Sequence, residues 1–249
     1  MMRSGNPALT ANTFTAMAPA ASSQYAMTIQ GAVNKTAILL FLVILTASWT
    51  WNMFLTSANP AAVMPWVLGG AIGGFIVAMV TIFKKTWAGF TAPIYALLEG
   101  LFLGAISSMF EARFPGIVIQ AVALTFGTLF ALLFAYKSGL IQATENFKLG
   151  VTAATGGIAL VYFATFVLGF FGVSVPYIHG SGLIGIGFSL FVVVIAALNL
   201  VLDFDFIEKG AEVGAPKYME WYGAFGLVVT LIWLYLEILI LLSKLYSRR

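Results

Sequence analysis

Seven long apolar stretches fill most of this chain, and almost no ionisable side chain lies inside them. Each is close to the ~20 apolar residues that a helix needs to cross the ~30 Å hydrocarbon core of a bilayer. The connections between them are short. The pattern predicts seven membrane-spanning helices, over residues 37–55, 63–83, 90–110, 116–136, 149–172, 182–202 and 222–242.

The composition excludes a water-soluble protein. Hydrophobic residues make up 61% of the chain and charged residues 8%, against roughly 25% charged residues in a soluble domain. Mean hydropathy is +1.00. We therefore expect an all-α polytopic membrane protein whose main surroundings are the lipid bilayer. The sequence pI of about 9.1 comes from scattered Lys and Arg, and no basic run exceeds Lys84-Lys85, so nucleic acid is not an expected partner.

No motif indicates an enzyme or a bound cofactor. The chain has no cysteine, which excludes disulfides and thiolate metal sites. Gly180, Gly182 and Gly185 fit G-x-G-x-x-G, but this motif runs directly into an apolar span, whereas a dinucleotide site needs a preceding strand. No H-E-x-x-H motif and no phosphate-binding loop is present.

The first 35 residues differ from the rest of the chain. They are rich in Ala, Ser, Thr, Asn and Met, and they lack the cationic start, apolar core and cleavage site of a secretory signal peptide. We expect a mobile N-terminal tail over residues 1–35 and a seven-helix transmembrane domain over residues 36–249. A weakly apolar stretch at residues 27–33 leaves open a short segment at the membrane interface.

The basic residues favour one orientation. If the N-terminus is cytoplasmic, the inside segments hold eight Lys or Arg residues and the outside segments hold four, three of them in the last six residues. Cytoplasmic loops carry the excess of Lys and Arg in membrane proteins. The bias therefore predicts a cytoplasmic N-terminus and a C-terminus on the opposite side.

Two pairs of glycines predict close helix contacts. Gly70 and Gly74 lie four residues apart in the second span, as do Gly100 and Gly104 in the third. Such small-xxx-small faces let helix backbones approach closely in lipid, where no hydrophobic force drives helices together. We interpret these glycines as packing residues.

Four carboxylates carry the functional signal. The other five acids (Glu111, Glu145, Glu208, Glu212 and Glu220) fall at span ends or in loops, where solvation is expected. Glu99 and Glu237 lie within the third and seventh spans, and Asp203 and Asp205 close the sixth. An unpaired carboxylate in hydrocarbon costs about 2.5–3.5 kcal/mol on insertion scales, so it must face the bundle interior, take a proton, find a partner or bind a cation. Two neighbouring buried carboxyl groups can share one proton and sense pH, and their oxygens suit Ca²⁺. A structural hydrogen bond between helices is the alternative role for each intramembrane Glu.

Helix geometry orders these candidates. Asn199 and Asp203 are four residues apart and share a face, whereas Asp205 points to nearly the opposite side. From the cytoplasmic side, Glu99 is roughly 14 Å along the third span, and Glu237 roughly 22 Å along the seventh. Asp203, near the cytoplasmic end of the sixth span, is therefore expected to reach Glu99 more easily than Glu237.

Two blocks of sequence resemble the Bax inhibitor-1 family, in its bacterial branch. The stronger match is residues 198–245, LNLVLDFDFIEKGAEVGAPKYMEWYGAFGLVVTLIWLYLEILILLSKL; the other is residues 92–111, APIYALLEGLFLGAISSMFE. The resemblance implies a pH-sensitive calcium-leak channel of the bacterial inner membrane, with six helices around a central seventh. It also implies a pH-sensing pair of acids, which by motif falls on Asp203 and Glu237.

The chain departs from the family pattern at this pair. The second acid is Glu rather than Asp, and the stretch between the two acids is longer by roughly two helical turns. The resemblance also implies an arginine in the second helix that holds the acid pair, and no arginine lies in the second span here. Motif and helix geometry thus give different partners for Asp203, namely Glu237 and Glu99. Asp203 and Glu237 are also the candidate ligands for Ca²⁺, which is expected as a permeant ion together with protons.

The expected activity is a slow, pH-gated cation leak. One rival is a non-channel modulator of a membrane protease or of quality control, and another is a proton-coupled transporter.

Overall fold

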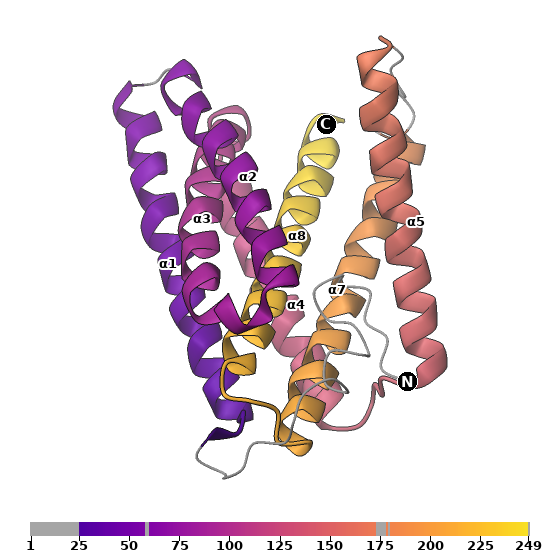
Figure 1. The fold of residues 1–249 in the computed structure, drawn as a ribbon. Helices are drawn as coiled ribbons and strands as arrows, with labels where there is room; N and C mark the ends of the chain where they lie inside the picture. Colours follow the sequence, from indigo (N-terminus) through magenta and orange to yellow (C-terminus); the bar gives the residue numbers. More distant parts are fainter. Residues whose placement is uncertain (1–24, 58–59, 173–177, 179, 249) are drawn as a thin grey trace. The chain divides into compact units, whose positions relative to one another are not determined.

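In the computed structural model, the described residues (25–57, 60–172, 178 and 180–248) are helical apart from turns and an isolated antiparallel bridge between Ala26 and Pro216 (Figure 1). Seven of the helices are long and apolar enough to cross a membrane. They are α1 (Ile29–Ser57), α2 (Pro60–Phe83), α3 (Ala88–Arg113), α4 (Ile117–Lys137), α5 (Glu145–Phe170), α7 (Leu183–Glu212) and α8 (Met219–Tyr246), with a short 3-10 turn, η3 (Lys85–Trp87), before α3. The expected all-α polytopic fold is confirmed.

The helices extend beyond most of the expected spans because polar residues continue them and specific side chains cap their ends. Thr144 accepts the backbone N–H of Phe147 and caps α5. The Glu111 carboxylate accepts the N–H groups of Gly116 and Val118, at 2.6 and 3.0 Å, where α4 begins. A carboxylate is favourable there because the first turn of a helix has unpaired N–H donors.

The N-terminal segment is ordered earlier than its composition suggests. Helix α1 begins at Ile29, so residues 29–35, which the sequence assigned to the tail, are helical. Just before it, Met27 N donates to the Ala215 carbonyl (2.6 Å) and Lys217 N donates to the Tyr25 carbonyl (2.9 Å). The segment before α1 is therefore fixed to the loop that precedes α8. Residues 1–24 of the expected tail lie outside the described residues.

The described chain forms two compact units. The first, called here the α1–α3 unit, contains the described residues up to Val118 together with Phe206–Val229. Within it, α1 and α2 both pack against α3 (Figure 1). A Cβ on Gly104 would meet the Ala47 carbonyl oxygen of α1, and a Cβ on Gly70 would lie 2.7 Å from the Leu98 carbonyl oxygen of α3. The predicted packing role of the glycine pairs is confirmed at these positions.

The second unit, called here the α4–α5 unit, contains Ile119–Asp205 and the chain from Thr230 onward. Its buried apolar centre is formed by Ile158 of α5 with Val192 and Ile195 of α7. Trp233 of α8 packs against this cluster. The unit therefore brings the facing sides of α5, α7 and α8 together.

Helix α8 is the most buried of the seven spans. In its apolar window 67% of the residues are buried, against 50% in α7 and 44% or less in the others. Helix α8 therefore leaves less of its apolar surface exposed than the other six spans do.

Candidate functional site

Glu237 lies inside the α4–α5 unit and uses only one of its two carboxylate oxygens. Its side chain is 4% exposed. Oε1 accepts the Tyr162 hydroxyl from α5 (2.9 Å) and the Trp233 indole N–H from α8 (3.2 Å). Oε2 is buried and has no hydrogen-bond partner among the described residues. A buried carboxylate oxygen without a donor is costly, so a proton, a cation or a water molecule would stabilise Oε2.

Asn199 and Asp203 lie one turn apart on α7, in a different part of the same unit from Glu237. Both are buried, and Asp203 is 0% exposed. Asn199 Nδ2 donates to the Thr155 hydroxyl of α5 and to the Ile195 carbonyl, each at 2.8 Å. Asp203 does not close its helix as expected, because α7 continues through polar residues to Glu212. It lies about nine residues before the helix end, at a depth of roughly 14 Å along the axis.

An apolar layer lies between these two parts of the unit. On α5, the residue bonded to Asn199 is Thr155, and the residue bonded to Glu237 is Tyr162, seven residues further along the helix. These two α5 residues define the Asn199 level and the Glu237 level. Ile158 lies between them and packs in the apolar cluster with Val192 and Ile195. Asp203 is one further turn away from Glu237, so the two carboxylates are separated by roughly 16 Å along the helices. The direct Asp203–Glu237 contact implied by the family resemblance does not fit this arrangement.

Asp205 has a different environment from Asp203. Its Oδ2 lies 2.9 Å from Lys148 Nζ of α5, and Lys148 also contacts Glu145 at 3.4 Å. The Lys148 side chain is almost fully buried. The predicted divergence of the two aspartates agrees with this pairing: Asp203 is the more buried one, and Asp205 belongs to an ion pair at one end of α5.

Glu99 belongs to the α1–α3 unit and faces the glycines of α2. A Cβ on Gly74 would lie 2.7 Å from Glu99 Oε1, so the carboxylate fills space that any larger residue at this position would occupy. The side chain is half-buried. Because Gly74 has no side chain, α2 leaves room for the Glu99 carboxylate of α3.

The described residues contain no group of three or more His, Cys, Asp or Glu side chains able to hold a metal ion. Asp203 and Glu237, the expected Ca²⁺ ligands, lie at separate levels and do not form a joint ligand set here.

The family model described as "Bax inhibitor 1 like" matches residues 6–247, nearly the whole chain and every carboxylate described above. The chain belongs to the Bax inhibitor 1 like family. No curated protein and no solved structure matches it in the same comparisons.

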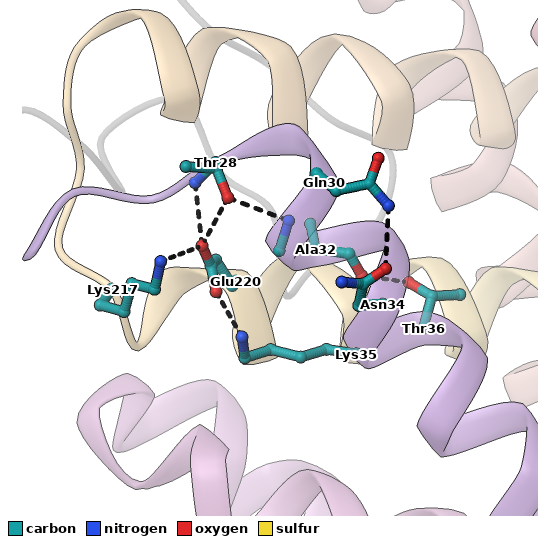
Figure 2. Close-up of polar contacts among 9 residues, drawn as sticks. Thr28, Gln30, Ala32, Asn34, Lys35, Thr36, Lys217 and Glu220 are labelled. Carbon is teal, nitrogen blue, oxygen red and sulfur yellow. Dashed lines mark hydrogen bonds and ion pairs between the residues drawn. The ribbon is translucent and has the colours of Figure 1, made fainter. Parts of the chain in front are cut away.

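This member of the Bax inhibitor 1 like family also has a buried carboxylate that its sequence did not reveal. Glu220 was expected to be solvated at a span end, and that expectation is wrong, because the side chain is 0% exposed. Its Oε1 accepts the backbone N–H (3.0 Å) and the hydroxyl (2.9 Å) of Thr28, and lies 3.1 Å from Lys217 Nζ. Its Oε2 accepts Lys35 Nζ of α1 (Figure 2).

This contact is a helix cap supplied by a different helix. Thr28 is the N-cap of α1, and its hydroxyl accepts the Gly31 N–H at 2.9 Å. In a capping box, an acid at the position of Gly31 would accept the Thr28 N–H. Here Glu220 of α8 takes that role, and a Cβ on Gly31 would overlap the Glu220 carboxylate. Glu220 therefore fixes the start of α1 to the start of α8 within the α1–α3 unit (Figure 2).

Proposed function

We propose that this protein is a pH-sensitive cation leak channel, with Ca²⁺ as the principal permeant ion, in which protonation of buried carboxylates controls the flow. The observation that carries the proposal is the free Oε2 of Glu237, which is buried beside an oxygen that already holds two hydrogen bonds. A proton on Oε2 would neutralise the site. Without that proton, the carboxylate presents a hard oxygen to a divalent cation.

The arrangement around Glu237 fits a closed route. Polar side chains recur along the α5–α7–α8 face, at the Asn199 and Glu237 levels, and the cluster around Ile158 interrupts them. Hydrophobic constrictions of this kind stop ions by excluding water. Conduction would require Ile158, Val192 and Ile195 to separate enough to admit water. We place the gate at this layer and the pH-sensitive groups at the carboxylates on either side of it.

Flux across pH tests the proposal directly. Purified protein would be reconstituted into liposomes that contain a Ca²⁺-sensitive dye, and uptake would be compared with protein-free liposomes between about pH 5 and pH 8, the range into which burial can move carboxyl titration. We expect the parent protein to carry Ca²⁺ at a rate that depends on pH. Glu237→Gln and Asp203→Asn, which keep side-chain shape, should each lose most of that dependence.

Two further variants act as references. Glu212→Gln changes an exposed acid in the last turn of α7 and should titrate like the parent. Glu99→Gln tests the carboxylate of the α1–α3 unit. If this variant loses the pH dependence while Glu237→Gln and Asp203→Asn keep it, the sensor is Glu99 and the proposed ion route along α5, α7 and α8 is wrong. If the parent moves no Ca²⁺ above the protein-free background, the channel proposal fails and a modulator of a membrane protease becomes the better account. Saturating flux that needs a co-substrate would indicate a transporter.

We further propose that the protein lies in the inner membrane of a bacterium with its N-terminus in the cytoplasm. Lys148 and Lys244 are buried, and without them the basic residues divide seven inside to three outside, so the bias is kept. Reporter fusions at both termini should show a cytoplasmic N-terminus and a C-terminus on the opposite side. A cytoplasmic signal from both fusions would contradict the proposed crossing of α8.

A further inference from the structure

Lys244 lies two residues before the end of α8, and its ammonium group is buried inside the protein. The side chain is 8% exposed. Nζ donates to the carbonyl oxygens of Ile178 (2.7 Å) and Gly185 (3.1 Å) and to the hydroxyl of Ser189 (2.8 Å). An ammonium has three donors, and all three are used. None of the ion pairs in the described part of the chain includes Lys244, so its direct contacts are neutral oxygens. The Glu237 carboxylate attracts the ammonium electrostatically but does not contact it.

This arrangement differs from that of an ordinary lysine near a membrane surface. Such lysines extend toward the headgroups and keep the charge in water. A buried charge that contacts no counter-ion is expensive unless its surroundings replace its hydration shell. Two carbonyls and a hydroxyl do this for Lys244, and such oxygens replace the water shell of monovalent ions in channel filters. Ca²⁺, by contrast, is bound mainly by carboxylates.

We propose that the oxygens of Ile178, Gly185 and Ser189 form a binding site for a monovalent cation of ammonium size, and that the Lys244 side chain occupies this site as a tethered cation. Lys244 follows Glu237 by seven residues, two turns along the same face of α8 and roughly 10 Å along its axis. The tethered charge therefore closes the α5–α7–α8 face beyond Glu237 and repels Ca²⁺ approaching from that end. Only this effect on Ca²⁺ rests on the proposed channel function; the cation site does not.

The chain has no cysteine, so one introduced thiol can be modified selectively. In Lys244→Cys the site is vacant. Aminoethyl methanethiosulfonate forms a disulfide with the thiol, releases methanesulfinate and restores a tethered ammonium of nearly the original length. Methyl methanethiosulfonate adds only a neutral group. Each product would be confirmed by mass spectrometry.

Thermal unfolding in detergent gives a readout that needs no flux. We expect Lys244→Cys to unfold at a lower temperature than the parent, and the aminoethyl adduct to recover most of the loss. Ammonium chloride should raise the unfolding temperature of the unmodified variant in a saturable way and leave the parent unchanged; tetramethylammonium chloride, which is too large for the site, is the salt control. Equal recovery by both adducts, or no ammonium effect, would overturn the cation site.

Ca²⁺ uptake in liposomes tests the consequence for the channel. Lys244→Cys should leak several-fold faster than the parent, and the aminoethyl adduct but not the methyl adduct should return to the parental rate. If the ammonium effect on unfolding is present but the parent carries no Ca²⁺, the cation site stands and the channel proposal fails. If the parent carries Ca²⁺ and the variant does not leak faster, the proposed block by Lys244 is wrong.

A second variant covers the case in which Lys244→Cys does not fold. Ser189→Ala removes one of the three oxygens and leaves Lys244 in place. Acetylation of Lys244, followed by mass spectrometry, should be several-fold faster in Ser189→Ala than in the parent, with the exposed Lys217 as the internal reference. An unchanged rate would show that Ser189 does not hold the ammonium and would overturn the proposal.

Discussion

Glu220→Ala is expected to lower the free energy of unfolding by about 3 kcal/mol, because removal of one partner of a buried ion pair leaves the other charge uncompensated. The Lys35 side chain, which is 17% exposed, loses its partner, and the Thr28 N–H loses its acceptor. Lys217 is 52% exposed and contributes little. Denaturant unfolding in detergent would measure the loss, and Glu212→Gln, on an exposed side chain, should stay within about 0.5 kcal/mol of the parent.

Gly31 separates the capping role of Glu220 from a general effect of its charge. Gly31→Ala places a Cβ where the Glu220 carboxylate lies, so it should destabilise the parent strongly. In the Glu220→Ala background this space is empty, and the same substitution should be tolerated. The two changes should therefore be far from additive. Additive effects would show that Glu220 does not cap α1, as would a Glu220→Ala protein as stable as Glu212→Gln.

The helices of this protein could be predicted from sequence because hydropathy is a local signal. Each span is a long run of mainly apolar residues, and a backbone in lipid must satisfy its hydrogen bonds within its own helix. The ends were less predictable. The polar final turns of α7, through Glu212, remain helical although they leave the apolar run, so Asp203 proved to be deeper in its helix than the hydropathy profile indicated.

The partners of the buried polar groups could not be predicted in the same way. Glu237 contacts Tyr162, 75 positions away, and Glu220 contacts Thr28, 192 positions away. Glu237 could be predicted as a functional residue because an acid in the middle of an apolar run is rare. Glu220 was expected to be solvated because the polar residues around it resemble those of any span end. The capping pattern at Thr28 could have given a hint, since its expected acid is replaced by Gly31.

Lys244 illustrates a further limit. Two of its three acceptors are backbone carbonyls, which every residue has, so no side-chain pattern marks the site. From the sequence alone, Lys244 was counted with the basic residues near the C-terminus as an indicator of membrane orientation. Burial of its ammonium depends on how α8 and the start of α7 meet within the α4–α5 unit. That is a property of packing rather than of either segment alone.

The contact between α1 and α3 should be the part of the α1–α3 unit most sensitive to a single methyl group. A Cβ on Gly104 would meet the Ala47 carbonyl oxygen and the Thr50 hydroxyl, and would lie 2.6 Å from Ala47 Cα. Two of these are backbone atoms of α1, which cannot rotate away as a side chain could. The helices would have to separate, and overpacking of this kind typically costs about 1–3 kcal/mol.

A matched substitution on a neighbouring helix isolates this effect. Gly69 of α2 has no atom within 4 Å of the position of an added Cβ. Alanine favours a helix over glycine by up to ~1 kcal/mol, so Gly69→Ala should be neutral or stabilising. Gly104→Ala gains the same helix propensity but loses close packing, and packing is what holds helices together in lipid, where hydrophobic drive between them is absent. Denaturant unfolding in detergent should therefore shift in opposite directions for the two variants. If both shift alike, glycine at position 104 reflects backbone preference rather than the approach of α1 to α3.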